Sequence, residues 1–503
     1  MKNRYIYLTV LAALGLTACE PEFDQELEDT PITAQESGDA DFSKYVAVGA
    51  SITAGYADGA VYIDGQDSAF PKLIAEKMEA AGGGTFTTPF MANNIGGFSN
   101  VYDEDENLAF NSRLVYNVAT GAPELYNDSP ANSITDFVTG YYSNMGIPGM
   151  KSFHSLFAGY GASAGVSVSP VLTNPYFARI ASSDDATVIG DAVAQNPTFF
   201  SLWLGGNDVL DYATTGGTGD LQDITTEIAP EDGDITDTTY FAGVYSTALS
   251  SLTANGASGV LFNVPAVTDL PYFTTVGYNV IPMDAATAEL TNAAFTDYNT
   301  AVAGAYSLGY IDADEYAART ISFSESTTNP VLILDEDLTD LATLFGNELL
   351  LNYRQATEDD LLVLTAASVI GTLADPTNPA SVYGVGVPLG DEFVLTPEEQ
   401  ELISDATTSY NTTIAALATA DANLMLFDAN ALLTTLKSSG VTSEGTTVTG
   451  DISLEGAFSL DGIHLNPRGN AVFANMVIED INDYFGSTLQ LHDPIYFSTL
   501  TFK

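Results

Sequence analysis

The chain has 503 residues, of which 66 are Asp or Glu and only 13 are Lys or Arg, so its formal net charge is −53 at pH 7. This balance argues strongly against a nucleic-acid partner, because phosphate binding needs clustered cations, and it opposes electrostatic docking on anionic lipid. Hydrophobic residues make up 46% of the chain, which is enough to form a substantial core. The single cysteine excludes an intrachain disulfide framework and a cysteine-based metal site.

The N-terminal segment, residues 1–18, has the pattern of a secretory signal peptide. Lys2 and Arg4 precede an apolar run that is shorter than the roughly 20 residues needed to span a bilayer. The run ends in Leu16-Thr17-Ala18-Cys19, which resembles the lipobox of bacterial lipoproteins. This resemblance implies that Cys19 is acylated and becomes the mature N-terminus, whereas the alternative is an incidental or buried cysteine.

An acidic stretch, residues 19–42, follows and is typical of a solvated tether. An acidic segment directly after the lipidated cysteine is similar to the surface-export signals of Bacteroidetes lipoproteins. Because acyl chains hold a protein through buried methylenes, we expect a protein that is anchored to a membrane and does not span it. The expected location is the bacterial outer membrane, and the choice between the cell surface and the periplasmic side stays open.

The remaining residues, 43–503, predict an α/β domain. Four apolar runs are typical of buried strands, and two further stretches have helical spacing. Strands separated by helices favour a parallel sheet with helices on both faces, which is the three-layer α/β/α class. The predicted strands are Tyr45–Val48, Thr198–Leu204, Gly259–Val264 and Leu424–Asp428, and the predicted helices begin near Phe70 and, after Asn466, at Pro467.

Two long stretches between the predicted strands exceed what a minimal domain of this class needs. Residues 82–140 and 310–400 are rich in Gly, Thr, Asn and Asp. Loops of this kind usually shape a substrate rim, so both stretches are predicted to be insertions. No linker marks a second domain.

The histidine and cysteine content limits the possible chemistry. With Cys19 assigned to the anchor, a cysteine nucleophile is excluded, and the three histidines of the chain are too few for a His-rich metal centre. Asp103–Asn107 begins like a calcium loop, but Leu108 stands where the turn glycine belongs, which excludes an EF-hand. No metal and no cofactor are predicted for the active site, and calcium elsewhere stays open. The histidines to be weighed as a general base are His154, His464 and His492.

Ser51 is the leading candidate for a nucleophile. It lies in Gly49-Ala50-Ser51-Ile52, directly after the first predicted strand, and doubly wound sheets bind ligands beyond the carboxyl ends of their strands. Backbone N–H groups at the start of the following turn or helix can stabilise an anion there. The alternative is a serine that only caps a turn or a helix.

His464 is the candidate general base because Asp461 stands three residues before it, with Gly462 allowing a tight turn between them. Such an arrangement can place the carboxylate on one imidazole nitrogen and leave the other free to take a proton from Ser51. The alternative is an Asp-Gly turn that precedes a helix by chance.

Two further glycine-rich segments could supply oxyanion donors. Asn207, in Gly205-Gly206-Asn207-Asp208 at the end of the second predicted strand, can donate from its side-chain amide, and the alternative is a turn asparagine. A glycine in Asn144–Gly149 can offer an unobstructed backbone N–H, and the alternative is an ordinary Gly-Pro loop.

Taken in chain order, the four segments around Ser51, Asn144–Gly149, Asn207 and Asp461–His464 resemble the motif blocks of the SGNH (GDSL-type) hydrolase superfamily. The resemblance covers residues 44–486 and leaves the insertions unexplained. It implies a flavodoxin-like three-layer α/β/α fold with a serine hydrolase site. The implied catalytic triad is Ser51, Asp461 and His464, and the implied oxyanion hole is the N–H of Ser51, the N–H of Gly149 and the amide of Asn207. Ala50 departs from the family motif, where Asp is usual. The departure alters the hydrogen bonding expected next to the nucleophile and removes no member of the implied catalytic set.

The predicted function is therefore a membrane-tethered serine esterase, or acylhydrolase, that acts through an acyl-serine intermediate. With so few cations, neutral esters are favoured as substrates, and lipid esters and acetylated polysaccharides both stay open. Lys151, two residues past Gly149, is the one cation weighed for binding a charged substrate group, but it is expected to be an exposed, solvated lysine. A non-catalytic lipoprotein that binds a glycan or another ligand and retains a hydrolase fold is the alternative, because fold does not fix function. A metal-dependent glycan-binding protein is a weaker alternative, suggested only by the many carboxylates.

Overall fold

A computed structural model describes residues 34–99, 101–102, 108–127, 129–130, 132–138, 140–167, 173–227, 229–347 and 349–503. The predicted signal peptide, Cys19, most of the acidic tether and the Asp103–Asn107 stretch lie outside these residues. The chain divides into two compact units, residues 1–35 and 36–503, and everything below concerns the second unit. Within the described ranges, no helix combines the length and the apolar character that crossing a membrane requires.

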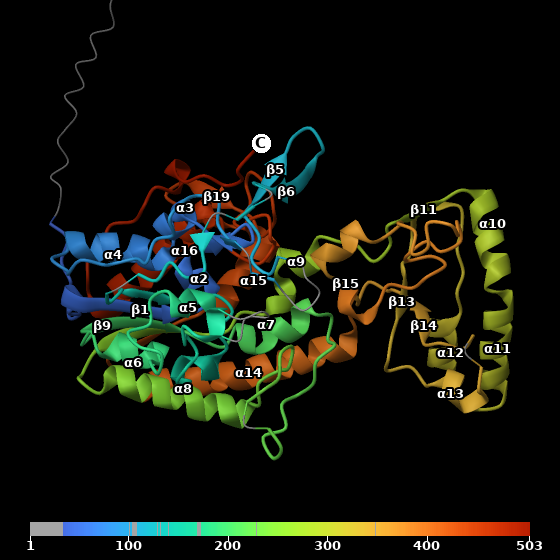
Figure 1. The fold of residues 1–503 in the computed structure, drawn as a ribbon, viewed down its shortest axis with the longest axis horizontal. Helices are drawn as coiled ribbons and strands as arrows, with labels where there is room; N and C mark the ends of the chain where they lie inside the picture. The colour runs from blue at the N-terminus through green and yellow to red at the C-terminus, as the bar shows by residue number, and fades with distance from the viewer. Residues whose placement is uncertain are drawn as a thin grey trace, which may run out of the picture. The chain divides into compact units, whose positions relative to one another are not determined.

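Five parallel strands form a central sheet in the order β17-β10-β9-β1-β8 (Figure 1). Along the chain, β8 is added on one side of β1, and β9, β10 and β17 follow on the other side, which is the flavodoxin-like order. The predicted α/β/α class is thus confirmed. The strands are β1 (Tyr45–Gly49), β8 (Asn144–Gly146), β9 (Phe199–Trp203), β10 (Ser258–Phe262) and β17 (Leu424–Phe427).

The strands of the sheet interior are continuous apolar runs because both of their faces are covered. All five residues of β1 and all five of β9 are buried. The edge strand β8 was not predicted, because it has only three residues, Asn-Met-Gly, and so carries no apolar run. Its register pairs Gly146 with Gly49 of β1. The segment Asn144–Gly149 and the segment that contains Ser51 therefore lie at the same end of the sheet.

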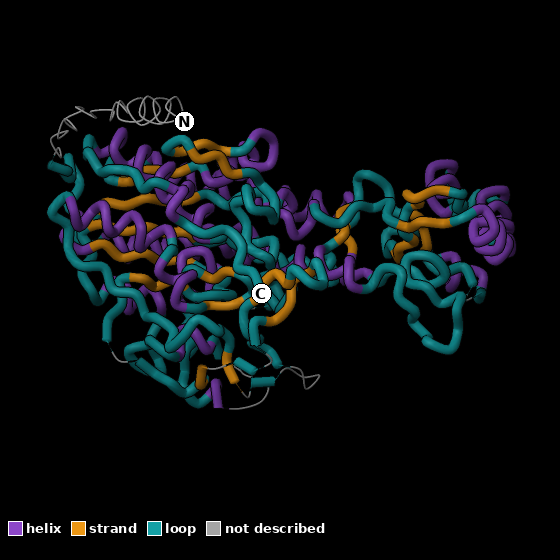
Figure 2. The backbone as a smooth tube through the Cα atoms, turned by 90° about the horizontal axis from the view of Figure 1, so that it is seen from above, coloured by secondary structure: helices purple, strands orange, loops and turns teal. Residues whose placement is uncertain are grey.

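Helices cover both faces of the sheet (Figures 1 and 2). The helices α4 and α16 pack against each other on one face, and α6, α8 and α14 lie together on the other. Both predicted helices are confirmed, and Asn466 caps α16 by accepting a hydrogen bond from the N–H of Gly469 at 2.9 Å. The bounds are α4 (Phe70–Ala80), α6 (Val188–Val193), α8 (Thr238–Thr253), α14 (Pro397–Thr419) and α16 (Pro467–Phe485).

An aromatic cluster fills the space between the sheet and the α4–α16 face. The ring of Trp203 stacks on that of Phe473 with centroids 5.1 Å apart and on that of Phe262 at 5.0 Å. Phe70 meets the same cluster edge-on. Aromatic contacts of this kind stabilise the fold beyond the effect of the area they bury. Trp203 of this cluster also lines the pocket described below.

The two stretches predicted to be insertions hold elements that do not join the central sheet, and we call these stretches the first and the second insertion. In the second, such elements are already present from Ile281, before the predicted start at residue 310. The first holds β4 (Phe98–Ser99), β5 (Leu114–Asn117), β6 (Ala122–Leu125) and β7 (Asn132–Ser133). The second holds β11 (Ile281–Met283), α10 (Ala285–Ala294), α11 (Thr296–Ser307), α12 (Ala313–Arg319), β12 (Ser326–Asn329), β13 (Leu332–Leu334), α13 (Leu341–Phe345), β14 (Tyr353–Gln355), β15 (Leu361–Leu362) and β16 (Val394–Leu395).

Short elements connect these parts, and several of them carry the residues discussed below. They are α2 (Ser51–Ala54), β2 (Tyr56–Ala57), β3 (Ala60–Val61), α3 (Ile63–Asp67), α5 (Pro175–Ala178), α7 (Asn207–Thr214), α9 (Pro271–Thr274), α15 (Ala429–Ser439), β18 (Val441–Ser443) and β19 (Thr446–Val448).

Candidate active site

Ser51 is the first residue of α2 and follows β1 across a one-residue turn. Because the chain leaves β1 for β8 on one side and later returns to β9 on the other, Ser51 stands at the topological switch point of the sheet. Gly49 is needed for this arrangement, since a Cβ there would lie 2.2 Å from Thr53 Oγ1. Gly146 is needed as well, since its Cβ would lie 2.3 Å from the backbone nitrogen of Ala54.

The fold brings Ser51 and His464 into contact although 413 positions separate them in the chain. The Oγ atom of Ser51 lies 2.8 Å from Nε2 of His464, and Nδ1 of His464 lies 3.0 Å from Oδ2 of Asp461. Ser51 and His464 are each 8% exposed, so the pair is largely shielded from solvent while still open to a pocket. The spatial arrangement of a nucleophile, a base and an orienting carboxylate is therefore present.

Asp461 is stabilised as a carboxylate by donors from two segments. Its Oδ1 accepts hydrogen bonds from the backbone N–H groups of Ile463 and His464, both at 2.9 Å, and its Oδ2 accepts one from Gly59 at 2.9 Å. Burial alone would raise the pKa of Asp461, but the neighbouring imidazole and these N–H groups outweigh burial and lower it to about 2. The carboxylate is therefore ionised throughout the neutral range and can hold one tautomer of His464.

The loop after α2 supplies supports that the sequence analysis missed. Asp58 has a left-handed backbone with φ of 53°, and its carboxylate accepts hydrogen bonds from the N–H of Leu460 at 3.0 Å and the hydroxyl of Tyr62 at 2.8 Å. Its own N–H donates to Ser459 Oγ at 2.9 Å, so Asp58 holds the segment directly before Asp461. Burial raises the pKa of Asp58 to about 6. The Asp58-Gly59 dipeptide is a common turn signal, so the sequence could have predicted a turn here.

Asn207 begins α7 and lines the same pocket as Ser51 and His464. Its Nδ2 donates a hydrogen bond to the carbonyl oxygen of Met150 at 3.1 Å. The next residue, Asp208, is fully buried and accepts hydrogen bonds from the N–H and the hydroxyl of Ser152 at 2.8 and 2.6 Å. These hydrogen bonds connect the segment that follows β8 to the start of α7, beside Ser51.

Gly149 lies one residue before the carbonyl that accepts from Asn207, but it is not among the residues that line the pocket. It is exposed and has φ of +76°, and a Cβ there would meet no atom within 4 Å. In the part of the chain that the structure describes, its N–H donates to no other group. Of the five predicted site residues, Ser51, Asn207 and His464 therefore line one pocket, Asp461 stands behind His464, and Gly149 lies beside the pocket.

The other two histidines have different partners. Nδ1 of His154 accepts a hydrogen bond from the N–H of Lys151 at 3.2 Å, and burial together with the charge of Lys151 lowers the pKa of His154 to about 4. Nε2 of His492 lies 2.9 Å from the carbonyl oxygen of Leu73. Among the described residues, His464 is thus the histidine that contacts Ser51.

The expectation that Lys151 is exposed is wrong. Lys151 is 2% exposed, and its Nζ donates to the carbonyl oxygens of Asp234 at 3.0 Å and Glu231 at 3.3 Å. It also lies 3.5 Å from a carboxylate oxygen of Asp211. Buried charges persist when they are paired and hydrogen-bonded, and these partners are invisible in the local sequence.

The pocket beside Ser51 is apolar and continues into a second apolar hollow. Of the described residues that line either one, none is Asp, Glu, Lys or Arg. We call the two together the apolar groove. The residues that line both hollows are Ile52, Trp203, Pro265, Leu270 and Ile463, and the second hollow adds Leu432, Leu433, Leu436 and Phe458, among others.

Fold and site together define a structural class, a flavodoxin-like α/β domain with serine, histidine and aspartate in hydrogen-bonding sequence at its topological switch point. Comparison with known proteins adds nothing to this description, because no family model, no curated protein and no solved structure matches the chain. A function for the chain rests on its own residues.

Proposed function

We propose that this protein is a serine esterase of the SGNH type that cleaves carboxylic esters through an acyl-serine intermediate. The observation that carries the proposal is the pair of contacts on the His464 ring, 2.8 Å from Ser51 Oγ on one side and 3.0 Å from Asp461 on the other. A serine hydroxyl is a weak nucleophile until an adjacent base takes its proton, and this geometry supports that transfer.

The proposed reaction has two halves. Ser51 Oγ attacks the ester carbonyl while Nε2 of His464 takes the hydroxyl proton, and Asp461 stabilises the imidazolium that forms. Collapse of the tetrahedral intermediate breaks the bond to the alcohol, which leaves with the proton from His464. A water molecule, deprotonated by the same nitrogen, then attacks the acyl-serine, and a second collapse releases the acid and returns the proton to Ser51.

The developing oxyanion needs donors that are already in place. The N–H of Ser51 lies in the first turn of α2, where N–H groups have no acceptor within the helix. The Asn207 amide has a second N–H besides the one that bonds Met150, and this second N–H is the proposed donor from α7. Gly149 is retained as the third proposed donor because its N–H carries no other hydrogen bond among the described residues.

The proposed substrate is a neutral ester with an aliphatic acyl chain. The apolar groove begins at the serine and offers no charged described residue to bind phosphate or carboxylate groups. Each methylene that enters such a groove contributes about 0.8 kcal/mol. An acetyl group would leave the second hollow empty, so the groove favours lipid-type esters over acetylated polysaccharides. Anchoring through Cys19 in the outer membrane remains part of this proposal.

Labelling by a fluorophosphonate tests whether Ser51 is activated. We expect wild-type protein to be labelled at Ser51 and to hydrolyse p-nitrophenyl butyrate, whereas Ser51→Ala loses both the label and, by on the order of 10⁴-fold or more, the turnover. The exposed Ser183→Ala is the matched control and is expected to behave as wild type. A folded wild-type protein that is neither labelled nor active would favour the non-catalytic binding lipoprotein.

A series of p-nitrophenyl esters of increasing acyl length tests the substrate class. We expect kcat/KM to rise about fourfold per methylene, as about 0.8 kcal/mol implies, until the groove is full. The part-exposed groove residue Leu432 offers a probe: Leu432→Gln lowers kcat/KM for octanoate and leaves acetate unchanged. Leu290→Gln, at an exposed leucine outside the groove, is the control. Equal loss on acetate and octanoate would exclude acyl binding in the groove.

A further inference from the structure

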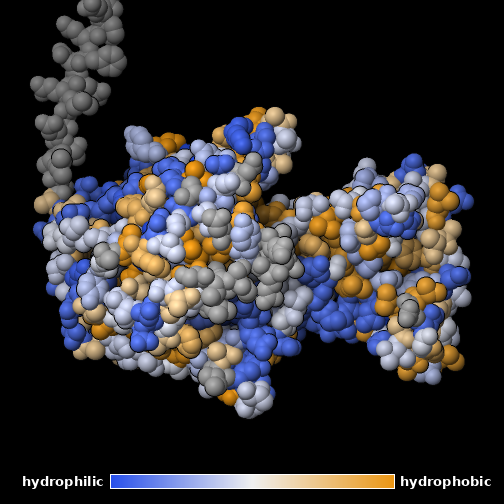
Figure 3. All heavy atoms as spheres, viewed as in Figure 1, coloured by the Kyte–Doolittle hydropathy of each residue, from blue (hydrophilic) through white to orange (hydrophobic). Residues whose placement is uncertain are grey.

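A second pocket, far richer in charge, lies between α7, α14 and the second insertion, and we call it the acidic pocket. Ten of the described residues that line it are Asp or Glu, and none of them is Lys or Arg. In Figure 3 the surface over the start of α14 is correspondingly hydrophilic. A high density of carboxylates is common on so acidic a protein, so this density alone identifies no site.

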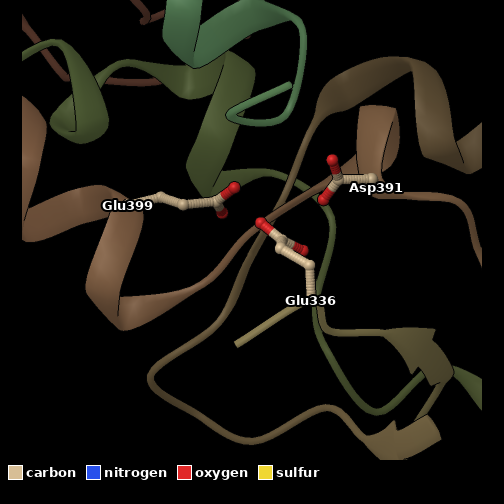
Figure 4. A group of neighbouring side chains, drawn as sticks. All are labelled: Glu336, Asp391 and Glu399. Carbon is tan, nitrogen blue, oxygen red and sulfur yellow. The ribbon is translucent and has the colours of Figure 1, made fainter. Parts of the chain in front are cut away.

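Three of these carboxylates converge more closely than the rest. Glu336 follows β13, Asp391 lies just before β16, and Glu399 lies in the first turn of α14. One oxygen of each lies within 4.8 Å of one oxygen of each of the others. Figure 4 shows the three side chains pointing toward one another from separate segments of the chain.

Glu399 provides a second observation, independent of the clustering, because one of its oxygens is buried without a partner in the described part of the chain. Its side chain is only 3% exposed, and its Oε2 accepts hydrogen bonds from the N–H of Thr396 at 2.6 Å and from its hydroxyl at 3.0 Å. Its Oε1 is buried and has no hydrogen-bond partner in the described part of the chain. A Cβ at Gly217 would lie 1.9 Å from Oε1, so the glycine keeps the space next to this oxygen free of a side chain.

Other buried acids of the insertion are neutralised within the chain. The guanidinium of Arg354 pairs with Asp335 and, through two bonds of 2.6 Å, with Asp360. Glu336, adjacent to Asp335 in sequence, has no such cation beside it in the described part of the acidic pocket. An ionised carboxylate that is buried without a partner is strongly unfavourable, so Glu399, the buried member of the three, would be stabilised in its ionised form by a cation bound among them.

We propose that Glu336, Asp391 and Glu399 bind a calcium ion. Hard divalent cations prefer oxygen ligands, and Ca²⁺ takes them at about 2.4 Å, so two oxygens on opposite sides of the ion can be about 4.8 Å apart. Mg²⁺ usually keeps several of its waters and binds through one or two carboxylates, so three converging carboxylates favour Ca²⁺. The ion would join the second insertion, which carries Glu336 and Asp391, to α14 of the domain core. This proposal is independent of the esterase activity.

Calcium titration of the chelator-treated full chain in 150 mM NaCl tests the site. We expect saturable binding of one Ca²⁺ by isothermal titration calorimetry and a rise in Tm with calcium, with a weaker response to Mg²⁺. Glu336→Gln is the main variant because Glu336 is exposed and its change spares the helix cap formed by Glu399. It is expected to lower calcium affinity by about tenfold or more, and Asp391→Asn to do the same.

Glu401→Gln is the matched control, since it removes one exposed carboxylate from the same pocket and helix but lies outside the converging three. Its affinity is expected to stay within about twofold of wild type, because it supplies no ligand. Absence of saturable binding at millimolar calcium would overturn the proposal. Equal losses in Glu336→Gln and Glu401→Gln would also overturn it, because they would show a diffuse acidic surface and no defined site.

Discussion

Two carboxylates of this protein, Asp461 beside Ser51 and Glu399 in the acidic pocket, are largely shielded from solvent but differ in how their charge is balanced. Both oxygens of Asp461 receive N–H groups from the chain, and an imidazole stands beside it. In the described part of the chain, only one oxygen of Glu399 has hydrogen-bond partners, and the charges that raise its pKa are other carboxylates. Among the described residues, the first site thus has partners for its charge, whereas those that line the second include no Lys or Arg.

The origin of the donors explains the difference. Asp461 lies in a tight turn whose own N–H groups point back at its carboxylate, and the loop after α2 adds Gly59. Glu399 caps its own helix with one oxygen, and its side chain points toward Glu336 and Asp391 (Figure 4). A carboxylate whose oxygens accept backbone N–H groups needs no further partner, whereas one that faces like charges is stabilised either by a proton or by a bound cation.

Removing the completed carboxylate should have the largest effect. Asp461→Asn is expected to lower kcat for an ester substrate by about 10⁴, because the neutral side chain no longer holds the required tautomer or stabilises the imidazolium. Steady-state rates with p-nitrophenyl butyrate measure the loss. The exposed Asp185→Asn is the control for a loss of one negative charge. A rate within tenfold of wild type would show that Asp461 has no part in catalysis.

Loss of the α7 donor should have the next largest effect. Asn207→Ala is expected to lower kcat by about 10²–10³ with little change in KM, since the amide acts on the oxyanion and not on the bound ester. Fluorophosphonate labelling of Ser51 should persist, which separates this variant from one that has unfolded. An unchanged kcat would remove Asn207 from the proposed oxyanion hole.

The pH dependence of stability tests the raised pKa of Asp58, the carboxylate that supports the segment before Asp461. The folded pKa of Asp58, about 6, lies above its ordinary value of 3.8, so its stabilising contribution is complete below pH 3.8 and is lost as pH rises through about 6. The amide side chain of the variant Asp58→Asn cannot ionise. The free energy of unfolding of this variant relative to wild type is therefore expected to rise by about 1–3 kcal/mol as the pH goes from about 4 to about 8. Urea unfolding at several pH values measures this difference, and parallel curves for the two proteins would contradict it.

Removing calcium should have the smallest effect on catalysis. None of the carboxylates that line the acidic pocket lines the apolar pocket beside Ser51, so EDTA is expected to lower Tm while changing the initial rate on p-nitrophenyl butyrate by less than about twofold. The helix α7 links the two sites, because it begins at Asn207 and carries Tyr212 into the acidic pocket. A large, calcium-reversible change in kcat would therefore show that the ion positions Asn207.

Local patterns in the sequence were sufficient to predict most of the sheet and the helices α4 and α16 that cover one of its faces. Four of its strands are apolar runs, because a strand covered on both faces must be apolar, and Pro467 marks the start of α16. The edge strand β8 escaped prediction because three residues with a polar start carry no periodicity. The helices α10 and α11 were not predicted either, because each buries few side chains and so carries little hydrophobic pattern.

The sequence by itself determined the residue types available for chemistry, namely one serine after the first strand, an Asp-Gly-Ile-His turn near the end and an asparagine after a glycine pair. Only the tertiary structure decided that Asp58 would support Asp461, that Lys151 would be buried, and that Glu336, Asp391 and Glu399 would meet. These contacts depend on which distant segments pack together and on how much water that packing removes. Burial of a charge and the identity of its partners are properties of three-dimensional packing, and no local pattern encodes them.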